Sequence, residues 1–264
     1  GQEKNVTNAA IAKMNLFLHG ASDFNILQGD TLREPKILQG GTVAKFDCVI
    51  ANPPFSLKRW GETEWRNDKY GRNIWGTPSD KVGADFAWIQ HMVQSMKPGT
   101  GRMAVVMPQG VLFRGNEEGE MRKKMVLTDM LEAVITLGEK LFFGTGLSPC
   151  ILIFRRVKPQ DHSSRVLMVD ASKILTVKRA QNELSPENVQ EIYQHYLDYA
   201  DKEDISRVVT LQEIEEKDFV LAPNRYVHYH QKEQESYESV KARFDAAVKA
   251  VREAEEAFNR LMAQ

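Results

Sequence analysis

Residues 45–56 read Lys-Phe-Asp-Cys-Val-Ile-Ala-Asn-Pro-Pro-Phe-Ser, and the fold class can be argued outward from this stretch. The apolar, β-branched run in its first half predicts a buried strand. The strand must end at the prolines, because proline fixes φ and has no N–H to donate to a neighbouring strand. Asn52 is therefore expected just past the carboxyl end of a strand, with Phe55 beside it on a rigid loop. Open α/β sheets bind their ligands at that edge.

The residue types at 52–55 suit group transfer to a weakly nucleophilic amine, such as the exocyclic amine of a heteroaromatic ring. The side-chain oxygen of Asn52 and the carbonyl of Pro53 can each accept one N–H of the amine. These contacts stabilise the positive charge that develops during transfer. Pro54 keeps the loop rigid, and Phe55 can stack on a base that has been rotated out of its duplex. The structural alternative is a strand followed by a Pro-Pro turn and an apolar plug.

The Ala-Asn-Pro-Pro-Phe-Ser segment at 51–56 resembles the amino-methyltransferase signature of S-adenosylmethionine-dependent enzymes. With its neighbours, it is similar to the modification subunit of type I restriction–modification systems. The other segments that carry this resemblance are Gly-Gln-Glu at 1–3, Met-Asn-Leu-Phe-Leu-His-Gly at 14–20, Gly-Asp-Thr-Leu at 29–32 and Asn-Arg-Tyr-Val at 224–227. The resemblance is good over residues 1–155. Protein-glutamine and RNA methyltransferases share the Asn-Pro-Pro-aromatic motif, although the glutamine enzymes usually carry Tyr where this chain has Phe55.

The resemblance implies a Rossmann-like α/β sheet and methylation of the N6 amine of adenine in DNA, with S-adenosylmethionine as cofactor. It implies a catalytic motif of four residues: Asn52, Pro53, Pro54 and Phe55. Glu3 would accept the ribose hydroxyls of the cofactor, as acids at strand ends do in dinucleotide folds. Asp30 would receive its adenine amino group, and Asn52 would also lie against it. From the residues alone, Glu3 also fits a solvated acid, and Asp30 also fits an Asx turn or a helix cap.

The chain opens on Gly-Gln-Glu, and no glycine-rich phosphate-loop pattern follows. The resemblance places a helical domain and the cofactor's glycine-rich loop upstream, so we expect a fragment whose sheet is partial and lacks its first strands. The 264 residues alone are then expected to bind S-adenosylmethionine weakly and to be inactive. The resemblance also implies a separate specificity subunit that reads the DNA, and a restriction subunit in the full complex. A non-catalytic assembly module, or a methyltransferase acting on RNA or protein glutamine, is the alternative.

Composition narrows the class of protein. The formal net charge is −1, from 35 Lys and Arg against 36 Asp and Glu, so DNA contact must come from local basic patches or from a partner. Cys48 and Cys150 are interpreted as small core residues rather than a disulfide pair. The histidines and cysteines lack zinc-site spacing, so no metal is expected. No apolar stretch is long enough to span a membrane and no signal peptide is found, so we expect a cytoplasmic protein without membrane contact.

The periodicity predicts three parts: a catalytic domain at 1–158, a small α/β extension that completes it at 159–228, and a helical extension at 229–264. Predicted helices cover 4–20, 85–96, 117–128 and 187–200, and predicted strands cover 25–28, 45–51, 102–107, 131–137, 150–154 and 165–169. This order fits a mostly parallel sheet finished by an antiparallel hairpin. Residues 57–82 interleave basic and aromatic side chains, which suits phosphate contact and base stacking. The alternative is a folded lid that packs on its own tryptophans.

Two further segments carry predictions about contacts. Phe142 and Phe143 are candidates to line the target-base pocket, with core packing as the alternative for at least one of them. In the last segment, apolar residues recur at steps of 4, 3, 4, 3, 4 and 3: Val240, Phe244, Ala247, Val251, Ala254, Phe258 and Leu261. This spacing is typical of a coiled-coil seam. We favour a helix that binds the specificity subunit over a helix that packs back on its own domain.

Overall fold

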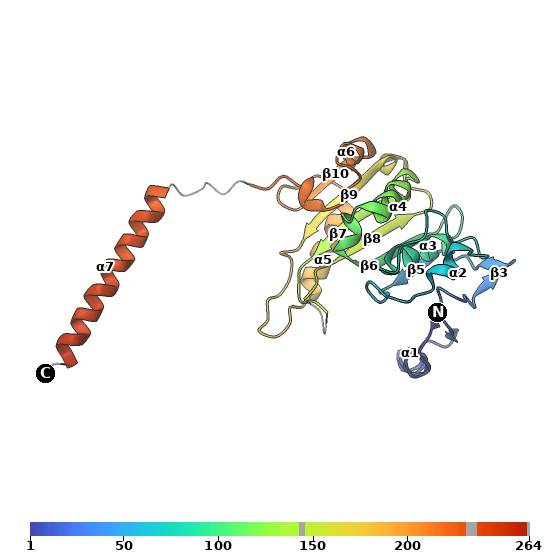
Figure 1. The fold of residues 1–264 in the computed structure, drawn as a ribbon, viewed down its shortest axis with the longest axis horizontal. Coiled ribbons are helices and arrows are strands. Elements are labelled where there is room, and N and C mark those ends of the chain that lie inside the picture. Colours follow the sequence, from blue (N-terminus) through green and yellow to red (C-terminus); the bar gives the residue numbers. More distant parts are fainter. Residues whose placement is uncertain (143–145, 231–236, 263–264) are drawn as a thin grey trace. The chain divides into compact units, whose positions relative to one another are not determined.

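The computed structural model describes residues 1–142, 146–230 and 237–262. The chain divides into two compact units, Gly1–His228 and Tyr229–Gln264, and each is described by itself. The first unit holds a mixed sheet with helices on both faces, and the second holds one long helix, α7 (Tyr237–Met262) (Figure 1).

The central sheet of the first unit has six strands in the order β10-β9-β7-β8-β6-β5. Their bounds are β5 (Cys48–Ala51), β6 (Arg102–Pro108), β7 (Leu131–Leu137), β8 (Pro149–Arg155), β9 (Arg165–Ala171) and β10 (Ser206–Thr210). β5 is parallel to β6, β9 is parallel to β7, and β8 is antiparallel to both β6 and β7. β5, β6, β7 and β9 therefore run in one direction, and their carboxyl ends share one edge, which we call the carboxyl edge. The predicted α/β sheet with an antiparallel hairpin is confirmed.

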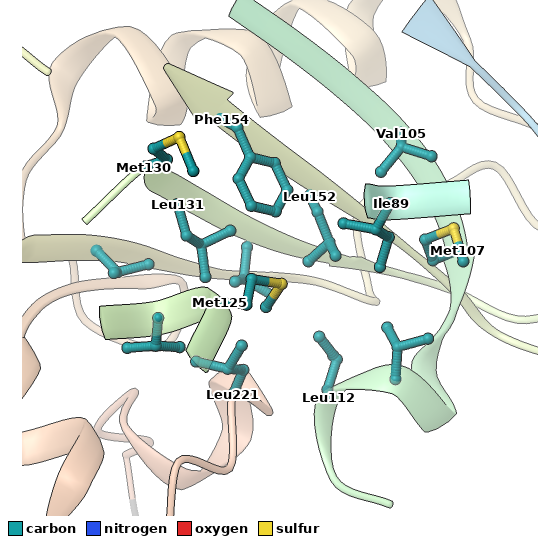
Figure 2. Close-up of a cluster of buried hydrophobic side chains, with 14 of the residues drawn as sticks. Ile89, Val105, Met107, Leu112, Met125, Met130, Leu131, Leu152, Phe154 and Leu221 are labelled. Carbon is teal, nitrogen blue, oxygen red and sulfur yellow. The ribbon is translucent and has the colours of Figure 1, made fainter. Parts of the chain in front are cut away.

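Helices cover the two faces because side chains alternate along each strand. On β9, Val166 and Met168 join one core cluster, whereas Leu167 and Val169 join another. The first cluster takes side chains from α3 (Asp85–Ser95) and α4 (Asn116–Leu127), and Figure 2 shows how they converge with those of the strands. The second cluster takes Ile192 from α5 (Pro186–Asp198). Each face of the sheet thus has its own apolar layer.

The prediction that the 45–51 strand is buried was wrong. β5 is an edge strand: within the part of the chain that the structure describes, only β6 pairs with it. Cys48 and Ala51 are exposed, and the side chain of Ile50 is 77% exposed. Cys150, in the middle of the sheet on β8, is fully buried as predicted. β5, at the edge of the sheet, is thus covered far less than the central strands β7 and β8, and its apolar sequence does not reveal this.

The amino-terminal region forms a separate pair of parallel strands, β1 (Gln2–Glu3) and β2 (Leu27–Gln28), linked by α1 (Val6–Leu18). The apolar residues of α1 are largely exposed: Ile11, Met14, Phe17 and Leu18. A short hairpin, β3 (Leu38–Gln39) and β4 (Thr42–Val43), follows. This hairpin lies in the stretch between the 25–28 and 45–51 strands, where no element was predicted.

The remaining elements of the first unit are short helices: α2 (Glu62–Arg66), η1 (Gln109–Leu112), η2 (Gln160–His162), α6 (Leu211–Glu215) and η3 (Pro223–Arg225). Ser185 caps α5, accepting a hydrogen bond from the backbone N–H of Asn188. In α7, taken by itself, Val240, Phe244, Val251 and Phe258 are all exposed. The side chain of Leu261 lies outside the described residues. No helix in the described ranges is both long and apolar enough to span a bilayer.

Candidate active site at the carboxyl edge of the sheet

The loop at residues 52–55, here called the acceptor loop, leaves the sheet at the carboxyl edge of β5. The ladder with β6 ends at Ala51 opposite Val105, because the next two residues after Asn52 are prolines. Pro53 is buried and Phe55 is half-buried, whereas Asn52 is exposed. Among the described residues, no hydrogen bond engages the amide of Asn52. Its acceptor oxygen is therefore available to an external group.

A second aromatic ring reaches the acceptor loop from the connection after β7. Phe142 lies in the connection that follows β7, and its ring meets that of Phe55 edge-on, with centroids 6.2 Å apart. Phe142 thus contacts the acceptor loop, and its role in lining a target-base pocket stays a prediction. Phe143, named with it, lies outside the described residues. Two half-buried rings are in contact at the loop that carries the exposed amide of Asn52.

Glu3 and Asp30 are brought together by the pairing of β1 with β2. Gly29 donates its N–H to the carbonyl of Glu3 at 2.9 Å, and Lys4 Nζ lies 2.9 Å from Asp30 Oδ2. The Glu3 carboxylate accepts the N–H of Asn5 at 2.7 Å. Glu3 ends β1, Asp30 lies two residues past the end of β2, and both are only partly buried. Each therefore keeps acceptor capacity for a polar ligand.

Asp30 also makes the local turn that the sequence offered as its alternative role. Its Oδ1 accepts the N–H groups of Leu32 at 3.2 Å and Arg33 at 3.1 Å. One oxygen thus shapes the turn while the other faces Lys4. The two interpretations of Asp30 are compatible, because a carboxylate has two oxygens and several lone pairs.

The predicted cofactor residues Glu3 and Asp30 are connected to the acceptor loop indirectly, through contacts with the segment that follows that loop. In the described part of the chain, no hydrogen bond or strand pairing joins Glu3 or Asp30 directly to residues 52–55. Leu32 instead packs with Trp60 and Trp65, and Arg33 Nη2 donates to the carbonyl of Arg59 at 3.0 Å. Arg72 is buried on Asp68 at 2.6 Å and donates to the carbonyls of Thr31 and Leu32, each at 2.8 Å. The turn at Asp30 is held against the 57–75 segment by these contacts.

The 57–82 segment is folded and packs on its own tryptophans, which is one of the two forms predicted for it. Trp60, Trp65 and Trp75 are buried, so their faces are not available for base stacking. The basic residues of the segment that remain exposed are Lys58, Arg59, Arg66, Lys69 and Lys81. Phosphate contact from this segment stays a prediction, and it concerns these five side chains.

The Asn-Arg-Tyr-Val segment at 224–227 lies at the same carboxyl edge. Tyr226 and Val227 are buried, whereas Asn224 and Arg225 line a cavity of about 470 Å³. Gln109, which follows β6, and Asp170, near the end of β9, line the same cavity. This part of the carboxyl edge is therefore hollow, and several of the side chains that line it are polar.

Sequence reasoning missed Asp85, whose buried carboxylate contacts the backbone of Ser56 directly after the acceptor loop. Asp85 begins α3, so its only local signal is an acid in the first turn of a helix, which usually serves the helix dipole. It also missed Arg114, whose guanidinium lies 3.0 Å from Asp85. These contacts join segments far apart in the sequence, and no spacing rule connects them.

Comparison with known proteins places this geometry in a family. The family model described as N-6 DNA Methylase matches residues 1–235. The chain is 36% identical over 238 residues to the type I restriction enzyme MjaVII methylase subunit of Methanocaldococcus jannaschii, covering 86% of this chain and 40% of that protein. It is 33% identical over 236 residues to the HindI methylase subunit of Haemophilus influenzae, covering 86% of this chain and 51% of that protein.

A solved structure agrees in fold as well as in sequence. The methyltransferase subunit of a type I restriction–modification system from Streptococcus thermophilus superposes with a TM-score of 0.78 and 33% identity. That match covers 86% of this chain and 47% of the solved one. The chain spans about half the length of the relatives it matches. With a matching family model over most of its residues, the chain belongs to the N-6 DNA methylase family.

Proposed function

We propose that this chain carries the amine-binding half of the active site of a DNA methyltransferase, which transfers a methyl group from S-adenosylmethionine to the N6 amine of adenine. The protein would be the modification subunit of a type I restriction–modification complex. The observation that supports this most directly is the exposed amide of Asn52 at the carboxyl edge, directly followed by buried Pro53, in a loop whose Phe55 packs edge-on against Phe142.

The acceptor loop would act by binding the target amine in its reacting geometry. The side-chain oxygen of Asn52 and the carbonyl of Pro53 each accept one N–H, which draws the nitrogen lone pair out of conjugation with the ring. Pro54 limits the motion of both acceptors, and Phe55 holds the base by stacking. The extra proton leaves after transfer, so the protein needs no strong general base. These contacts strengthen as positive charge develops, which is the condition for catalysis rather than tight substrate binding.

The residues at the ends of β1 and β2 fit the proposed cofactor. S-adenosylmethionine supplies an activated methyl group when it is bound, and its nucleoside offers two ribose hydroxyls and an aromatic amine as hydrogen-bond donors. Glu3, at the end of β1, and Asp30, in the turn after β2, are partly exposed carboxylates, and such acceptors suit donors of this kind. We assign Glu3 to the ribose and Asp30 to the adenine amine, with Asn52 near the methyl donor.

The partners follow from charge and from the names of the relatives. With a net charge of −1, this chain offers little electrostatic attraction of its own to a DNA backbone. The matched relatives are named methylase subunits of type I restriction enzymes. We propose that a specificity subunit holds the DNA, with a restriction subunit in the full complex. Residues 1–158 and 159–228 would together form the catalytic unit, and 229–264 the contact helix.

The test uses the full-length subunit assembled with its specificity subunit. Asn52→Ala should lower single-turnover transfer of labelled methyl groups to DNA by about 10²–10³-fold, the usual loss for one transition-state acceptor. Calorimetry should show nearly unchanged affinity for S-adenosylmethionine. Asn67→Ala, at another exposed asparagine, is the control and should transfer normally. Near-normal transfer by Asn52→Ala, or methylation of RNA or protein glutamine in place of adenine, would reject the proposal.

A further inference from the structure

We propose that Asp85 and Arg114 are a positioning pair. Through hydrogen bonds to Ser56, the pair fixes the acceptor loop in its reactive conformation. The proposal rests on the proposed function, because the loop's conformation matters only if residues 52–55 bind the target amine. It adds two positioning residues, from α3 and from the loop before α4, to a motif otherwise confined to the end of β5.

Both oxygens of the Asp85 carboxylate are used, and two of their three contacts go to Ser56. Oδ1 accepts the backbone N–H of Ser56 at 2.7 Å, and Oδ2 accepts its hydroxyl at 3.2 Å. Oδ2 also accepts from Arg114 Nη1 at 3.0 Å, and Arg114 Nη2 reaches the Ser56 hydroxyl at 3.5 Å. Asp85 is fully buried. Hydrogen bonds to a buried charged acceptor are among the stronger ones that proteins make.

These hydrogen bonds to Ser56 matter because this residue has an unfavourable backbone conformation. Its φ is +48°, in the left-handed region that residues with a Cβ seldom adopt. The charge-assisted bonds from Asp85 hold Ser56 in that conformation. Because two prolines stiffen the segment between Asn52 and Ser56, the position of Ser56 is transmitted to the amide of Asn52.

Two glycines, Gly83 and Gly110, leave the space that the contacts among Ser56, Asp85 and Arg114 need. A Cβ on Gly83 would lie 2.6–2.8 Å from backbone atoms of Ser56, so only glycine lets these segments approach. A Cβ on Gly110 would lie 2.4–2.5 Å from the guanidinium of Arg114. Gly110 does not have a positive φ, so a side chain there would displace the guanidinium without straining its own backbone. The close approach of Gly83 to Ser56, and that of Gly110 to Arg114, therefore each require a residue without a side chain.

A second carboxylate competes weakly for the arginine. Arg114 Nη1 lies 3.3 Å from the nearer oxygen of Glu118, whose side chain is 2% exposed. Burial raises the pKa of Glu118 although Arg114 opposes the rise. Arg114 Nη1 lies nearer to Asp85, at 3.0 Å, than to Glu118, and its Nη2 reaches the Ser56 hydroxyl. The arginine therefore joins Asp85 and Ser56 while it also contacts α4.

The first experiment compares Asp85→Asn, Gly110→Ala and Arg114→Lys in the full-length subunit within its complex. Each should lower kcat for DNA methylation by about tenfold to a hundredfold, the scale of a misplacement of roughly 1 Å. Arg114→Lys should lose least, because lysine keeps the charge. KM for DNA and the affinity for S-adenosylmethionine should stay within about twofold, because neither ligand touches the pair.

The matched control is Glu132→Gln. Glu132 is equally buried and is held by Arg155 at 2.7 Å, but it lies at the amino end of β7, opposite the carboxyl edge. It should lower the melting temperature as Asp85→Asn does and leave kcat unchanged. If Asp85→Asn and Glu132→Gln lower kcat equally after correction for folded protein, the pair has only a structural role and the proposal is wrong.

Hydrogen exchange separates this proposal from the proposed function. The Ser56 amide should exchange slowly in the wild type and in Glu132→Gln, and at least tenfold faster in Asp85→Ala and Gly110→Ala. Fast exchange in the wild type would overturn the positioning pair even if the complex methylates DNA. Slow exchange in a complex that methylates no adenine would instead reject the proposed function and leave the hydrogen bonds to Ser56 intact.

Discussion

Phe55 and Phe142 meet edge to face at the carboxyl edge, with ring planes at 84° and centroids 6.2 Å apart. The two residues come from different connections, one after β5 and one after β7, so the sheet sets their separation. Edge-to-face pairs contribute about 0.5–1.5 kcal/mol beyond the area that they bury. Both rings remain half-buried rather than fully enclosed, so part of their surface is available to a planar ligand.

Phe55→Ala should weaken capture of the target adenine, because base–aromatic stacking contributes about 1–3 kcal/mol per base. In the assembled enzyme, the fluorescence of 2-aminopurine placed at the target position reports whether the base has left the duplex. We expect the wild type and Phe55→Tyr to give a large increase on binding, and Phe55→Ala to require at least fivefold more protein for the same increase. Identical titrations for all three would show that Phe55 is only a plug.

The two cysteines should react very differently with a thiol reagent. Cys48 is exposed on β5, whereas Cys150 is buried on β8, and burial raises the pKa of the Cys150 thiol. Because the thiolate is the reactive form, Ellman's reagent should modify one thiol of the folded 264-residue chain quickly and the second only after denaturation. Cys48→Ser should abolish the fast phase. A fast phase that survives this substitution would have to come from Cys150 and would contradict its burial on β8.

Acid should destabilise the fold through His91. Burial, reinforced by the charge of Arg72, lowers the pKa of His91 to about 3. Arg72 Nη1 lies 3.4 Å from His91 Nδ1, and arginine can only donate, so the neutral imidazole accepts there. Since the pKa is lower in the folded state than in the unfolded chain, this contribution is complete above about pH 6.5. It is lost as the pH falls toward 3, at no more than about 1.4 kcal/mol per pH unit.

Urea unfolding at pH 7 and pH 5 measures this effect. Between these two values the wild type should lose about 2 kcal/mol more of its free energy of unfolding than His91→Gln, which cannot take up a proton. Glutamine can still accept from Arg72, so the variant should remain folded at pH 7. Equal losses in the two proteins would show that His91 titrates normally.

The sequence predicted the sheet well because each strand and helix carries its own pattern. The strands from 102 to 169 and helices α3, α4 and α5 lie where apolar periodicity and turn residues placed them. The burial of β5 was mispredicted, because the number of strands that pair with a given strand is a property of the whole sheet. A short apolar run has the same sequence signal in the middle of a sheet and at its edge.

The candidate site also contains residues that the sequence could predict and residues that it could not. The acceptor loop could be predicted because Asn52 and its prolines are adjacent in sequence and their chemistry is local. Asp85 could not, because its contact with Ser56 depends on how α3 packs beside β5. For Trp60 and Trp65 the sequence left two alternatives open, because a tryptophan among basic residues suits a base-stacking surface and an apolar core equally; the structure shows the second.

The last prediction concerns the apolar stripe of α7. Val240, Phe244, Val251 and Phe258 follow the 4-3 spacing of a coiled-coil seam, and their side chains are 43–66% exposed. A single helix cannot bury its own stripe, and each large side chain that becomes buried contributes roughly 1.5–3 kcal/mol. Such a stripe therefore needs a second surface, which we propose is the specificity subunit.

Phe244→Asp combined with Phe258→Asp should abolish co-purification of the specificity subunit and leave the melting temperature of the 264-residue chain within about 2 °C of the wild type. Ala242→Asp with Ala246→Asp is the matched control, because it adds the same charge on the opposite side of the helix and should still capture the subunit. A large fall in melting temperature with the phenylalanine pair would mean that the stripe packs on its own domain. Capture that survives the phenylalanine pair would mean that the specificity subunit binds elsewhere, since two buried aspartates in a coiled-coil seam cost more than such an interface can tolerate.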